Sequence, residues 1–233
     1  MKISLCIFNL NEIKALKFIV PLIFKNLSNL NIDDIYVVDG GSTDGSLEYL
    51  KNFNLNIINQ KNKGIGNAMI EGINKIKSDY IIFFNPDGNE DVKDISKFKK
   101  FFEQNYDIVI ASRMLKESFN EEDVNILKLR KWTNQTFTLI VNLIYNRNKY
   151  VTDTINGFRG GNLNKLRALK LNTPGHAIEY QMSIRSFKKK YRIVEFPTYE
   201  YPRIGGHTTA PSFKTGIIFI KFLIYEIFFS KFK

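Results

Sequence analysis

The sequence predicts an α/β protein in which helices flank a mostly parallel central sheet. In the first half of the chain, short apolar runs alternate with longer segments of helical periodicity, and Gly, Asn or Asp follows most of the runs. Strands that alternate with helices form right-handed units around a parallel sheet, which binds ligands at the carboxyl ends of its strands. With 233 residues and 44% hydrophobic content, the chain is long enough for one sizeable core.

Capping and turn-forming residues mark the ends of the predicted elements in the first half. Asn11 is suited to cap the first helix, and Pro21 should either kink this helix or mark a later start. The turn-rich DGGSTDGS after Val38 ends the second strand. Strands are predicted over residues 3–8, 35–38, 57–59, 80–84 and 107–111, and helices over 11–30, a stretch ending at Phe53, 64–77 and 91–104.

The second half of the chain is less regular. It is expected to hold a basic and aromatic helix over 125–147, the loop TDTINGFRGGN over 152–162, a helix over 177–188, a strand over 192–196 and the Gly-rich YPRIGGHT over 201–208. The helix mixes apolar residues with cations, so that it suits either a membrane surface that guides a lipid or an ordinary core position.

The C-terminal segment is strongly apolar over residues 216–232, although Lys221 and Glu226 interrupt it. It is shorter than the roughly 20 predominantly apolar residues that a membrane span requires. Two interpretations stay open: an anchor at the membrane interface, and a helix packed on its own domain. The expected division is a main domain over 1–210 and a C-terminal apolar helix over 211–233. The apolar N-terminus ends at Asn9, too early for a secretory signal core.

The charge balance points to anionic partners. The chain carries 34 Lys and Arg against 23 Asp and Glu, a net charge of +11, which favours a nucleotide diphosphate, a phosphorylated lipid, an anionic membrane or nucleic acid. The single Cys6 excludes an internal disulfide and suits a reducing compartment or simple core packing.

Carboxylates follow three of the predicted strands. Glu12 comes after the first strand, Asp39 after the second and Asp87 after the fourth. An acidic residue at a strand exit is commonly a turn or helix cap. Because parallel strands bring their carboxyl ends to one edge, however, we expect these three to share a crevice that holds one nucleotide and a metal ion.

The segment NPDGN over residues 85–89 is the strongest metal candidate. It places Asp87 two residues after Asn85 and two before Asn89, directly after the apolar strand YIIFF. Mg²⁺ and Mn²⁺ accept hard oxygen ligands and complete their shells with water and substrate phosphates. The same residues also suit a type I turn, and the two interpretations are compatible.

Several motifs follow one another in a fixed order over residues 3–207: NE after the first strand, DGGSTDGS, NKGIGNAM, NPDGN after an apolar strand, and ASR at 111–113. In this order they resemble the family 2 glycosyltransferases with the GT-A fold. DTINGFR and the later YPRIGG are similar to the branch that contains dolichyl- and polyprenyl-phosphate mannosyl- and glucosyltransferases.

For the donor, the resemblance implies that Glu12 and Asp39 bind the nucleoside and that the segment from Lys63 to Gly66 lies close to the sugar nucleotide. The family usually has a Pro near the end of the first strand, where this chain has Phe8, and this leaves the base contacts open.

For the metal, the resemblance implies that Asp87 binds Mg²⁺ or Mn²⁺ with help from Asn89. Asn85 stands beside the diphosphate, where the family usually has the first Asp of its DxD motif. The missing negative charge leaves three outcomes open: weaker metal binding, a different metal, or a sugar-nucleotide-binding protein without catalysis.

For the acceptor, the resemblance implies that Arg113, Arg130 and Arg203 gather on a phosphate, with Asn134 near the place of a phosphate-binding Ser. Arg suits phosphate because its planar fork makes bidentate, charge-assisted hydrogen bonds. The alternative for any one of these arginines is a solvated surface charge, and the matching local motifs favour the functional interpretation for Arg113 and Arg203.

The expected activity is inverting transfer of a hexose from a nucleotide-diphospho-sugar to a polyprenyl phosphate or a cell-surface glycan, peripherally on the cytoplasmic face of a membrane. A hydroxyl acceptor needs a base, for which Asp153 and Glu179 are candidates, whereas an ionised phosphate does not. Asp153 is also placed to pair with Arg159.

Other classes of protein fit the sequence less well. A nucleotidyltransferase would need a Gly-rich loop where FNLNE stands after the first strand. A nucleic-acid-binding module would display its aromatic residues on a stacking face, but here they fall in apolar strands and helices. A non-catalytic sugar-nucleotide sensor is the non-enzyme alternative, because of Asn85.

Overall fold

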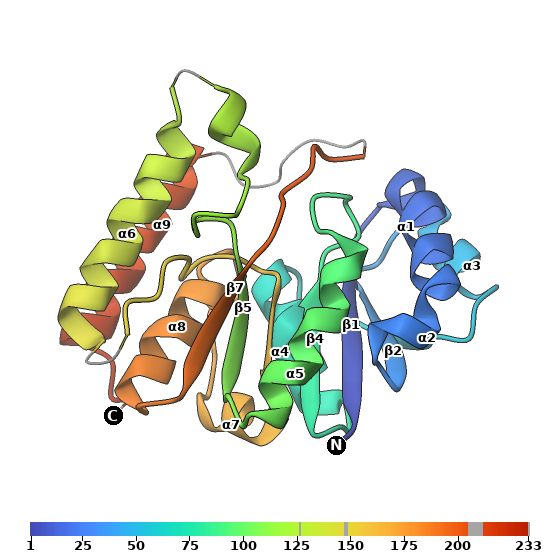
Figure 1. Cartoon of the computed structure of the whole chain (residues 1–233), viewed down its shortest axis with the longest axis horizontal. Coiled ribbons are helices and arrows are strands. Elements are labelled where there is room, and N and C mark those ends of the chain that lie inside the picture. Colours follow the sequence, from blue (N-terminus) through green and yellow to red (C-terminus); the bar gives the residue numbers. More distant parts are fainter. Residues whose placement is uncertain (126, 147–148, 205–211, 233) are drawn as a thin grey trace.

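The computed structural model describes residues 1–125, 127–146, 149–204 and 212–232 of the chain. A seven-stranded sheet forms the centre of this part, in the order β3-β2-β1-β4-β6-β5-β7 (Figure 1). The strands are β1 (Ile3–Asn9), β2 (Asp34–Asp39), β3 (Asn56–Asn59), β4 (Tyr80–Phe84), β5 (Ile108–Ser112), β6 (Arg159–Asn162) and β7 (Ile193–Pro197).

The sheet is mostly parallel, which confirms the predicted fold class. Strands β1, β2, β3 and β4 pair in parallel, as do β5 and β7, and only β6 runs antiparallel to its neighbours β4 and β5. The carboxyl ends of the six parallel strands therefore lie along one edge. The prediction of a loop over 152–162 is wrong at its end, because residues 159–162 form β6.

Two helical layers cover the sheet, and the alternation of side chains in β1 shows why. Ile3, Leu5 and Ile7 pack on one face, whereas Cys6 and Phe8 pack on the other. The first face is covered by α1 (Ile13–Lys25), α2 (Leu27–Leu30), α3 (Ser46–Leu50), the 3₁₀ helix η1 (Val92–Lys97) and α5 (Phe98–Glu103). The second is covered by α4 (Ile65–Lys75), α6 (Leu129–Tyr145), α7 (Leu163–Ala168), α8 (Ile178–Lys188) and α9 (Ser212–Phe228).

The first helix begins differently from the prediction. Helix α1 contains Pro21 in its interior and starts at Ile13, and Asn11 does not cap it. Instead Asn11 has a positive φ of 57° and its Oδ1 accepts a hydrogen bond from the Thr43 amide, while the Ile13 amide donates to the Asp44 carboxylate. The DGGSTDG loop therefore supplies the acidic group at this helix N-terminus, where it is electrostatically favourable.

Helices α6 and α9 lie side by side at one flank of the molecule (Figure 1). Phe137 of α6 and Phe219 of α9 pack on each other with ring centroids 5.4 Å apart. Helix α6 starts at Leu129, later than predicted; Ile126, Arg147 and residues 205–208 of the Gly-rich motif lie outside the described residues. Within the described part, no helix is both long and apolar enough to cross a membrane.

Helix α9 is held to the domain by a buried carboxylate. Glu226, whose side chain is 0% exposed, pairs with Arg185 Nη2 at 2.9 Å and with Lys188 Nζ at 2.9 Å, both from α8. These two cations hold the pKa of Glu226 below its usual value although burial opposes this shift. The inward side of the C-terminal helix thus packs on its own domain, while its outer side is apolar and exposed.

We expect Glu226→Gln to lower the free energy of unfolding by about 3 kcal/mol, because it leaves two cations around a neutral buried group. Urea denaturation of the variant and the wild type measures this difference. Lys221→Gln, on the exposed side of the same helix, is the matched control and should change stability by less than about 0.5 kcal/mol. Equal stability of Glu226→Gln and the wild type would show that the pair does not hold α9.

Candidate functional site

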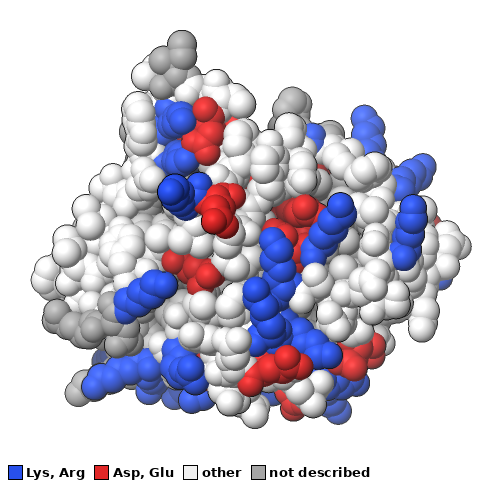
Figure 2. All heavy atoms as spheres, in the orientation of Figure 1, with Lys and Arg blue, Asp and Glu red and all other residues white. Residues whose placement is uncertain are grey.

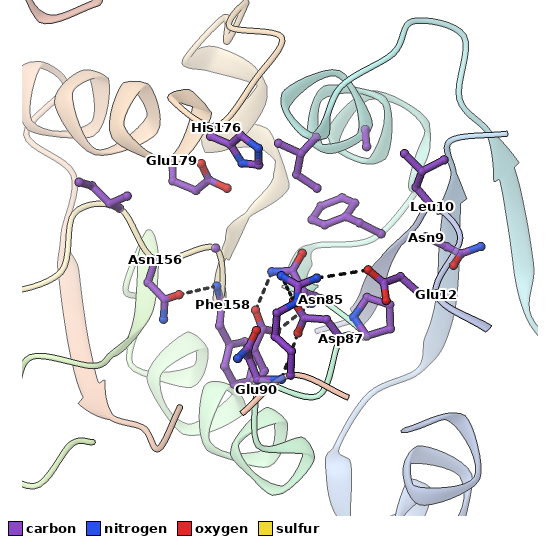
Figure 3. Close-up of a pocket in the computed structure, with 18 of the residues that line it drawn as sticks. Asn9, Leu10, Glu12, Asn85, Asp87, Glu90, Asn156, Phe158, His176 and Glu179 are labelled. Atoms are coloured by element: carbon purple, nitrogen blue, oxygen red, sulfur yellow. Dashed lines mark hydrogen bonds and ion pairs between the residues drawn. The ribbon is translucent and has the colours of Figure 1, made fainter. Parts of the chain in front are cut away.

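A cleft of about 1100 Å³ lies at the carboxyl ends of β1, β2 and β4 (Figure 3). Its other side is formed by the segments that follow β5 and β7 and by α6 and α9. Ten of the site residues singled out from the sequence line it: Glu12, Lys63, Asn85, Asp87, Asn89, Arg113, Arg130, Asn134, Glu179 and Arg203. Three others do not line the cleft but support the segments around it: Asp39, Gly66 and Asp153.

Arg203 joins the two sides of the cleft. Its Nη1 lies 3.1 Å from Asp87 Oδ2 and its Nη2 lies 3.3 Å from Glu12 Oε1. Burial raises the pKa of both Glu12 and Asp87, and Arg203 opposes the shift. The buried Nε of Arg203 has no hydrogen-bond partner among the described residues. Arg203 is therefore the counterion of Asp87, the predicted metal-binding carboxylate, while its Nε–H donor has no acceptor among the described residues.

The NPDGN turn is organised by its own side chains. The Asn89 amide donates to Asp87 Oδ1 at 3.0 Å, and Asn89 Nδ2 donates to the Tyr201 carbonyl at 2.6 Å. Asn85 donates to Glu90 twice, from its amide at 2.9 Å and from Nδ2 at 2.7 Å. The turn and the metal candidate are thus one structure, as the sequence interpretation allowed.

The cleft is acidic although the protein is basic. Six carboxylates line it against four Lys and Arg, whereas the chain as a whole carries a net charge of +11. Figure 2 shows carboxylates in the upper and central parts of this face with cations beside them, and further cations along its lower part. Because a nucleotide diphosphate is itself anionic, this wall can bind one only with an additional cation or after its arginines rearrange.

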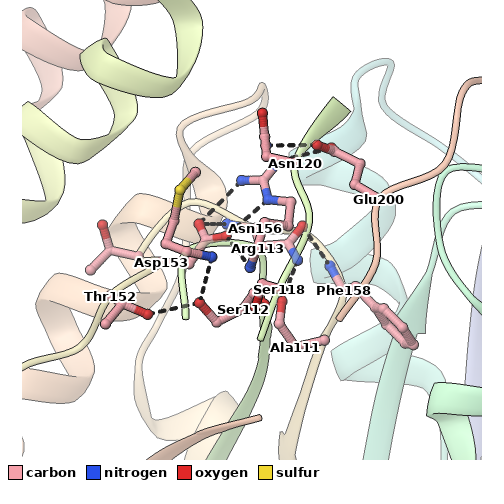
Figure 4. A network of polar contacts seen from close by, with 12 residues as sticks. Ala111, Ser112, Arg113, Ser118, Asn120, Thr152, Asp153, Asn156, Phe158 and Glu200 are labelled. Carbon is pink, nitrogen blue, oxygen red and sulfur yellow. Dashed lines mark hydrogen bonds and ion pairs between the residues drawn. The ribbon is translucent and has the colours of Figure 1, made fainter. Parts of the chain in front are cut away.

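Arg113 is fully engaged by carboxylates (Figure 4). Its Nε and Nη2 donate to Asp153 at 2.8 and 3.1 Å, and its Nη1 donates to Glu200 at 3.0 Å. The Asp153 side chain is 1% exposed, and although burial would raise its pKa, Arg113 holds that pKa below its usual value. A buried carboxylate of lowered pKa is a poor base, so Asp153 holds Arg113 in position rather than facing an acceptor. It pairs with Arg113 and not, as the sequence allowed, with Arg159.

Arg130 and Asn134 occupy the cleft-facing side of the first turns of α6. Arg130 is paired with Glu121, and its Nε lies 3.9 Å from Glu122, both in the acidic 3₁₀ helix η2 (Glu121–Val124). Both predicted acceptor residues therefore reach the cleft, but Arg130, like Arg113, has a carboxylate partner with which any incoming phosphate must compete.

Asp39 organises the loop after β2. It is 3% exposed, and it accepts hydrogen bonds from Asn9 Nδ2 at 2.6 Å, Ser42 Oγ at 2.7 Å and the amides of Gly41 and Ser42. These bonds fix Gly40 and Gly41, which line the cleft. Asp39 thus shapes the donor-side wall through the backbone.

Gly66 is required where α4 meets the loop before α8. A Cβ at Gly66 would lie 2.1 Å from the Thr173 carbonyl oxygen, and the Gly66 amide donates to the Pro174 carbonyl at 3.0 Å. Gly66 therefore permits a close backbone approach and does not face the cleft, whereas Lys63, three residues earlier, is exposed and lines it.

Glu179, in the first turn of α8, lines the cleft and has a strongly raised pKa. It is 7% exposed, and burial raises its pKa to about 7, with Arg159 opposing the shift. Figure 3 shows Glu179 beside His176 and across the cleft from Asn85 and Asp87. A carboxyl group that titrates near neutral pH can accept or donate a hydrogen bond to a substrate hydroxyl.

The donor chemistry of the cleft fits a divalent cation. The Asp87, Asn85 and Glu90 side chains provide hard oxygen atoms, and Mg²⁺ or Mn²⁺ usually needs only one or two carboxylates besides substrate phosphates. No group of three or more His, Cys, Asp and Glu side chains in the described ranges is arranged to hold a metal by itself. The substrate would have to complete any such site.

A sequence profile of the family described as "Glycosyl transferase family 2" matches residues 4–167, about two thirds of the chain. The chain therefore belongs to this family. The described part of the chain also has the α/β fold of the similar solved structures.

Two curated proteins are similar to this chain. Glycosyltransferase AglJ of Haloferax volcanii is 26% identical over 191 residues, covering 81% of this chain and 61% of AglJ, so that the chain spans about three fifths of that relative's length. UDP-N-acetylglucosamine–dolichyl-phosphate N-acetylglucosaminyltransferase of Methanococcus voltae is 28% identical over 245 aligned positions, covering 93% of both chains.

Solved structures of glucosyl-3-phosphoglycerate synthase from Mycobacterium tuberculosis share the fold. The complex with Mn²⁺, UDP-glucose and phosphoglyceric acid has a TM-score of 0.73 at 15% identity and covers 96% of this chain and 78% of that one. The complex with Mg²⁺ and UDP has a TM-score of 0.67 at 17% identity over the same shares. At this identity the likeness shows the GT-A fold alone, as predicted.

Several cleft residues were not selected from the sequence. Glu90, Glu121 and Glu200 line the cleft, and Glu200 holds Arg113 as well as Asn120. Glu90 had a local signal, since it directly follows NPDGN, whereas Glu121 and Glu200 lie outside any motif and are brought in by η2 and the segment after β7.

The raised pKa of Glu179 predicts a measurable pH dependence. Between about pH 4.5 and 7 the folded chain keeps a proton on this residue that the unfolded chain has lost, so the free energy of unfolding should fall as pH rises through this window. We expect Glu179→Gln to reduce this fall by about 1–3 kcal/mol. Urea denaturation at pH 5 and pH 8 measures it, with the exposed Glu103→Gln as control. An unchanged fall in the variant would contradict the assignment.

Proposed function

We propose that this glycosyltransferase moves a hexosyl unit, with inversion, from a nucleotide-diphospho-sugar to a polyprenyl phosphate at a membrane surface, with the help of Mg²⁺ or Mn²⁺. One observation carries the proposal: three arginines face a carboxylate-lined cleft, and Arg203 has a buried Nε with no partner among the described residues. The Methanococcus relative is named for a dolichyl-phosphate acceptor, which supports this choice of acceptor.

The donor belongs on the side of β1, β2 and β4. Glu12, the loop fixed by Asp39, and Lys63 surround the space for the nucleoside and diphosphate. Asp87, with oxygen atoms from Asn85 and Asn89, would hold the metal ion. When bound, this ion supplies positive charge to the diphosphate leaving group. The acidic lining explains why such a cation is needed, and the neighbouring structures that contain Mn²⁺ or Mg²⁺ with UDP are consistent with it.

The acceptor belongs on the side of β5, β7 and α6. Arg113 is held there by Asp153 and Glu200, and Arg130 by Glu121, so each guanidinium is fixed in orientation. The buried Nε of Arg203 has no partner among the described residues. Arginine forks bind phosphate oxygens by charge-assisted bonds, which position the attacking oxygen.

The reaction balances without a protein base. An acceptor phosphate oxygen forms the new bond to the anomeric carbon in line with the bond to the donor diphosphate, which breaks and leaves its electron pair on the nucleoside diphosphate. Because the acceptor phosphate is ionised at neutral pH, no side chain has to take a proton. Glu179 is then free to hydrogen-bond the transferred sugar.

Membrane contact is proposed from the α6–α9 apolar face. On the side of α6 and α9 away from the core, large apolar side chains are exposed, and Figure 2 shows few charges over this flank. Large exposed apolar patches mark interaction sites, and amphipathic helices lie in the membrane interface. The face consists of Leu129, Trp132, Leu139, Leu143, Ile144, Ile217, Ile218, Ile220, Ile224, Tyr225, Ile227 and Phe228.

The donor site is tested with Asp87→Asn. Thermal-shift measurements against UDP- and GDP-sugars, with and without Mn²⁺, should show a metal-dependent stabilisation of the wild type by one donor that the variant loses. Turnover on polyprenyl phosphate should fall by about 100-fold or more, since several kcal/mol of charge stabilisation are lost. Asp79→Asn, before the opposite end of β4, is the matched control.

Retained metal-dependent donor binding in Asp87→Asn would overturn the metal assignment. Donor binding by the wild type without transfer to any acceptor would instead favour the alternative suggested by Asn85, a sugar-nucleotide-binding protein without catalysis. Transfer to glycan hydroxyls but not to polyprenyl phosphate would overturn the acceptor assignment while leaving the donor site intact.

Membrane binding is tested by flotation with vesicles of equal parts phosphatidylcholine and phosphatidylglycerol. We expect the double variant Leu143→Glu/Ile224→Glu to lose most of the vesicle-bound fraction, because charge on the apolar face opposes insertion. Phe18→Glu, equally exposed but on α1 in the opposite helical layer, should bind like the wild type. If the double variant floats as the wild type does, this face is not the contact.

A further inference from the structure

Glu90 is a cleft carboxylate that no ion pair neutralises within the described ranges. It lines the cleft, and the hydrogen bonds to its side chain come from Asn85, through the amide at 2.9 Å and Nδ2 at 2.7 Å. Figure 3 shows Glu90, Asp87 and Asn85 in one cluster at the end of β4. Asp87, by contrast, has Arg203 as its counterion at 3.1 Å.

We propose that Glu90 supplies the second carboxylate for the divalent cation, in place of the acidic residue that Asn85 lacks. This inference rests on the metal-dependent donor binding proposed above and concerns one residue within it. Asn85 remains in the site as the residue that orients Glu90 and contributes a carboxamide oxygen. The site then has the two carboxylates and the substrate phosphates that Mg²⁺ and Mn²⁺ commonly use.

The geometry explains how a charge three positions after Asp87 can serve the same site. Gly88 has a φ of 88°, a left-handed conformation that reverses the chain within the turn, and this brings Glu90 back to Asn85. Each carboxylate oxygen of Glu90 uses one lone pair on Asn85 and keeps another. A metal ion between Asp87 and Glu90 would also provide the positive charge that Arg203 gives to Asp87 in its absence.

A purely structural role for Glu90, as a clasp for the turn, makes a different prediction from a role as metal ligand. Glu90→Gln keeps the side-chain length and one acceptor for the Asn85 amide, but it removes the charge. In the double variant Asn85→Asp/Glu90→Gln the charge moves to position 85, and the amide introduced at 90 can donate to the carboxylate introduced at 85. The hydrogen bond is thereby reversed and the net charge of the site is restored.

The experiment measures Mn²⁺ binding by electron paramagnetic resonance in the presence of UDP. We expect Glu90→Gln to bind Mn²⁺ at least about tenfold more weakly than the wild type, and the double variant to recover to within about threefold. Glu103→Gln, an exposed position on α5, is the control, and thermal unfolding monitored by circular dichroism verifies that each variant is folded.

Two results would overturn the inference: Mn²⁺ affinity of Glu90→Gln equal to that of the wild type, or a double variant as weak as Glu90→Gln. Asp87→Asn distinguishes this failure from failure of the proposed function. If Asp87→Asn loses Mn²⁺ and Glu90→Gln does not, the metal site stands without Glu90. If the wild type itself binds no Mn²⁺ with UDP, the proposed metal-dependent function fails.

Discussion

The contact of Arg203 with Glu12 and Asp87 determines the state of the whole cleft. It ties the segment after β7 to the ends of β1 and β4, so that the two halves of the sheet are joined across the substrate space. A metal ion and Arg203 both bring positive charge to Asp87, so they compete for the same carboxylate. Binding of a metal-bound donor would therefore release Arg203 toward an anionic acceptor, which couples the two substrates through one side chain.

The remaining arginines show a related compromise. Arg113 and Arg130 are held by carboxylates of the protein, which fixes their direction but reduces the charge available to a phosphate. Such pre-positioning lowers the ordering cost when the ligand arrives, at the expense of competition from Glu200 and Glu121. The arrangement suits a ligand with more than one negative charge and several acceptor oxygens, and this is what a phosphate monoester offers.

Sequence patterns predicted the sheet and the contents of the cleft better than the roles of individual residues. The parallel strands were visible because their apolar runs are buried on both faces, and strand exits then located Glu12 and Asp87. Strand β6 could not be predicted, because Gly160 and Gly161 have low strand propensity. Gly160 permits a close approach of two backbones, since a Cβ at this position would lie only 2.6 Å from the Ile81 carbonyl oxygen. Asp39 and Asp153 show the same limit: a motif marks a carboxylate but cannot say whether it faces the ligand or holds the wall.

The position of α6 links the chemistry of the cleft to the proposed membrane surface. Asn134 and Arg130 face the cleft, while Trp132 and Leu139 of the same helix lie on the α6–α9 apolar face. With 3.6 residues per turn, these two pairs lie on nearly opposite sides of α6, about one helix diameter or roughly 10–12 Å apart. A lipid whose phosphate lies among the arginines therefore needs only to turn around α6 for its chain to enter the apolar layer. A soluble glycan acceptor would gain nothing from this proximity, and the exposed apolar side chains would then remain a solubility cost without a function.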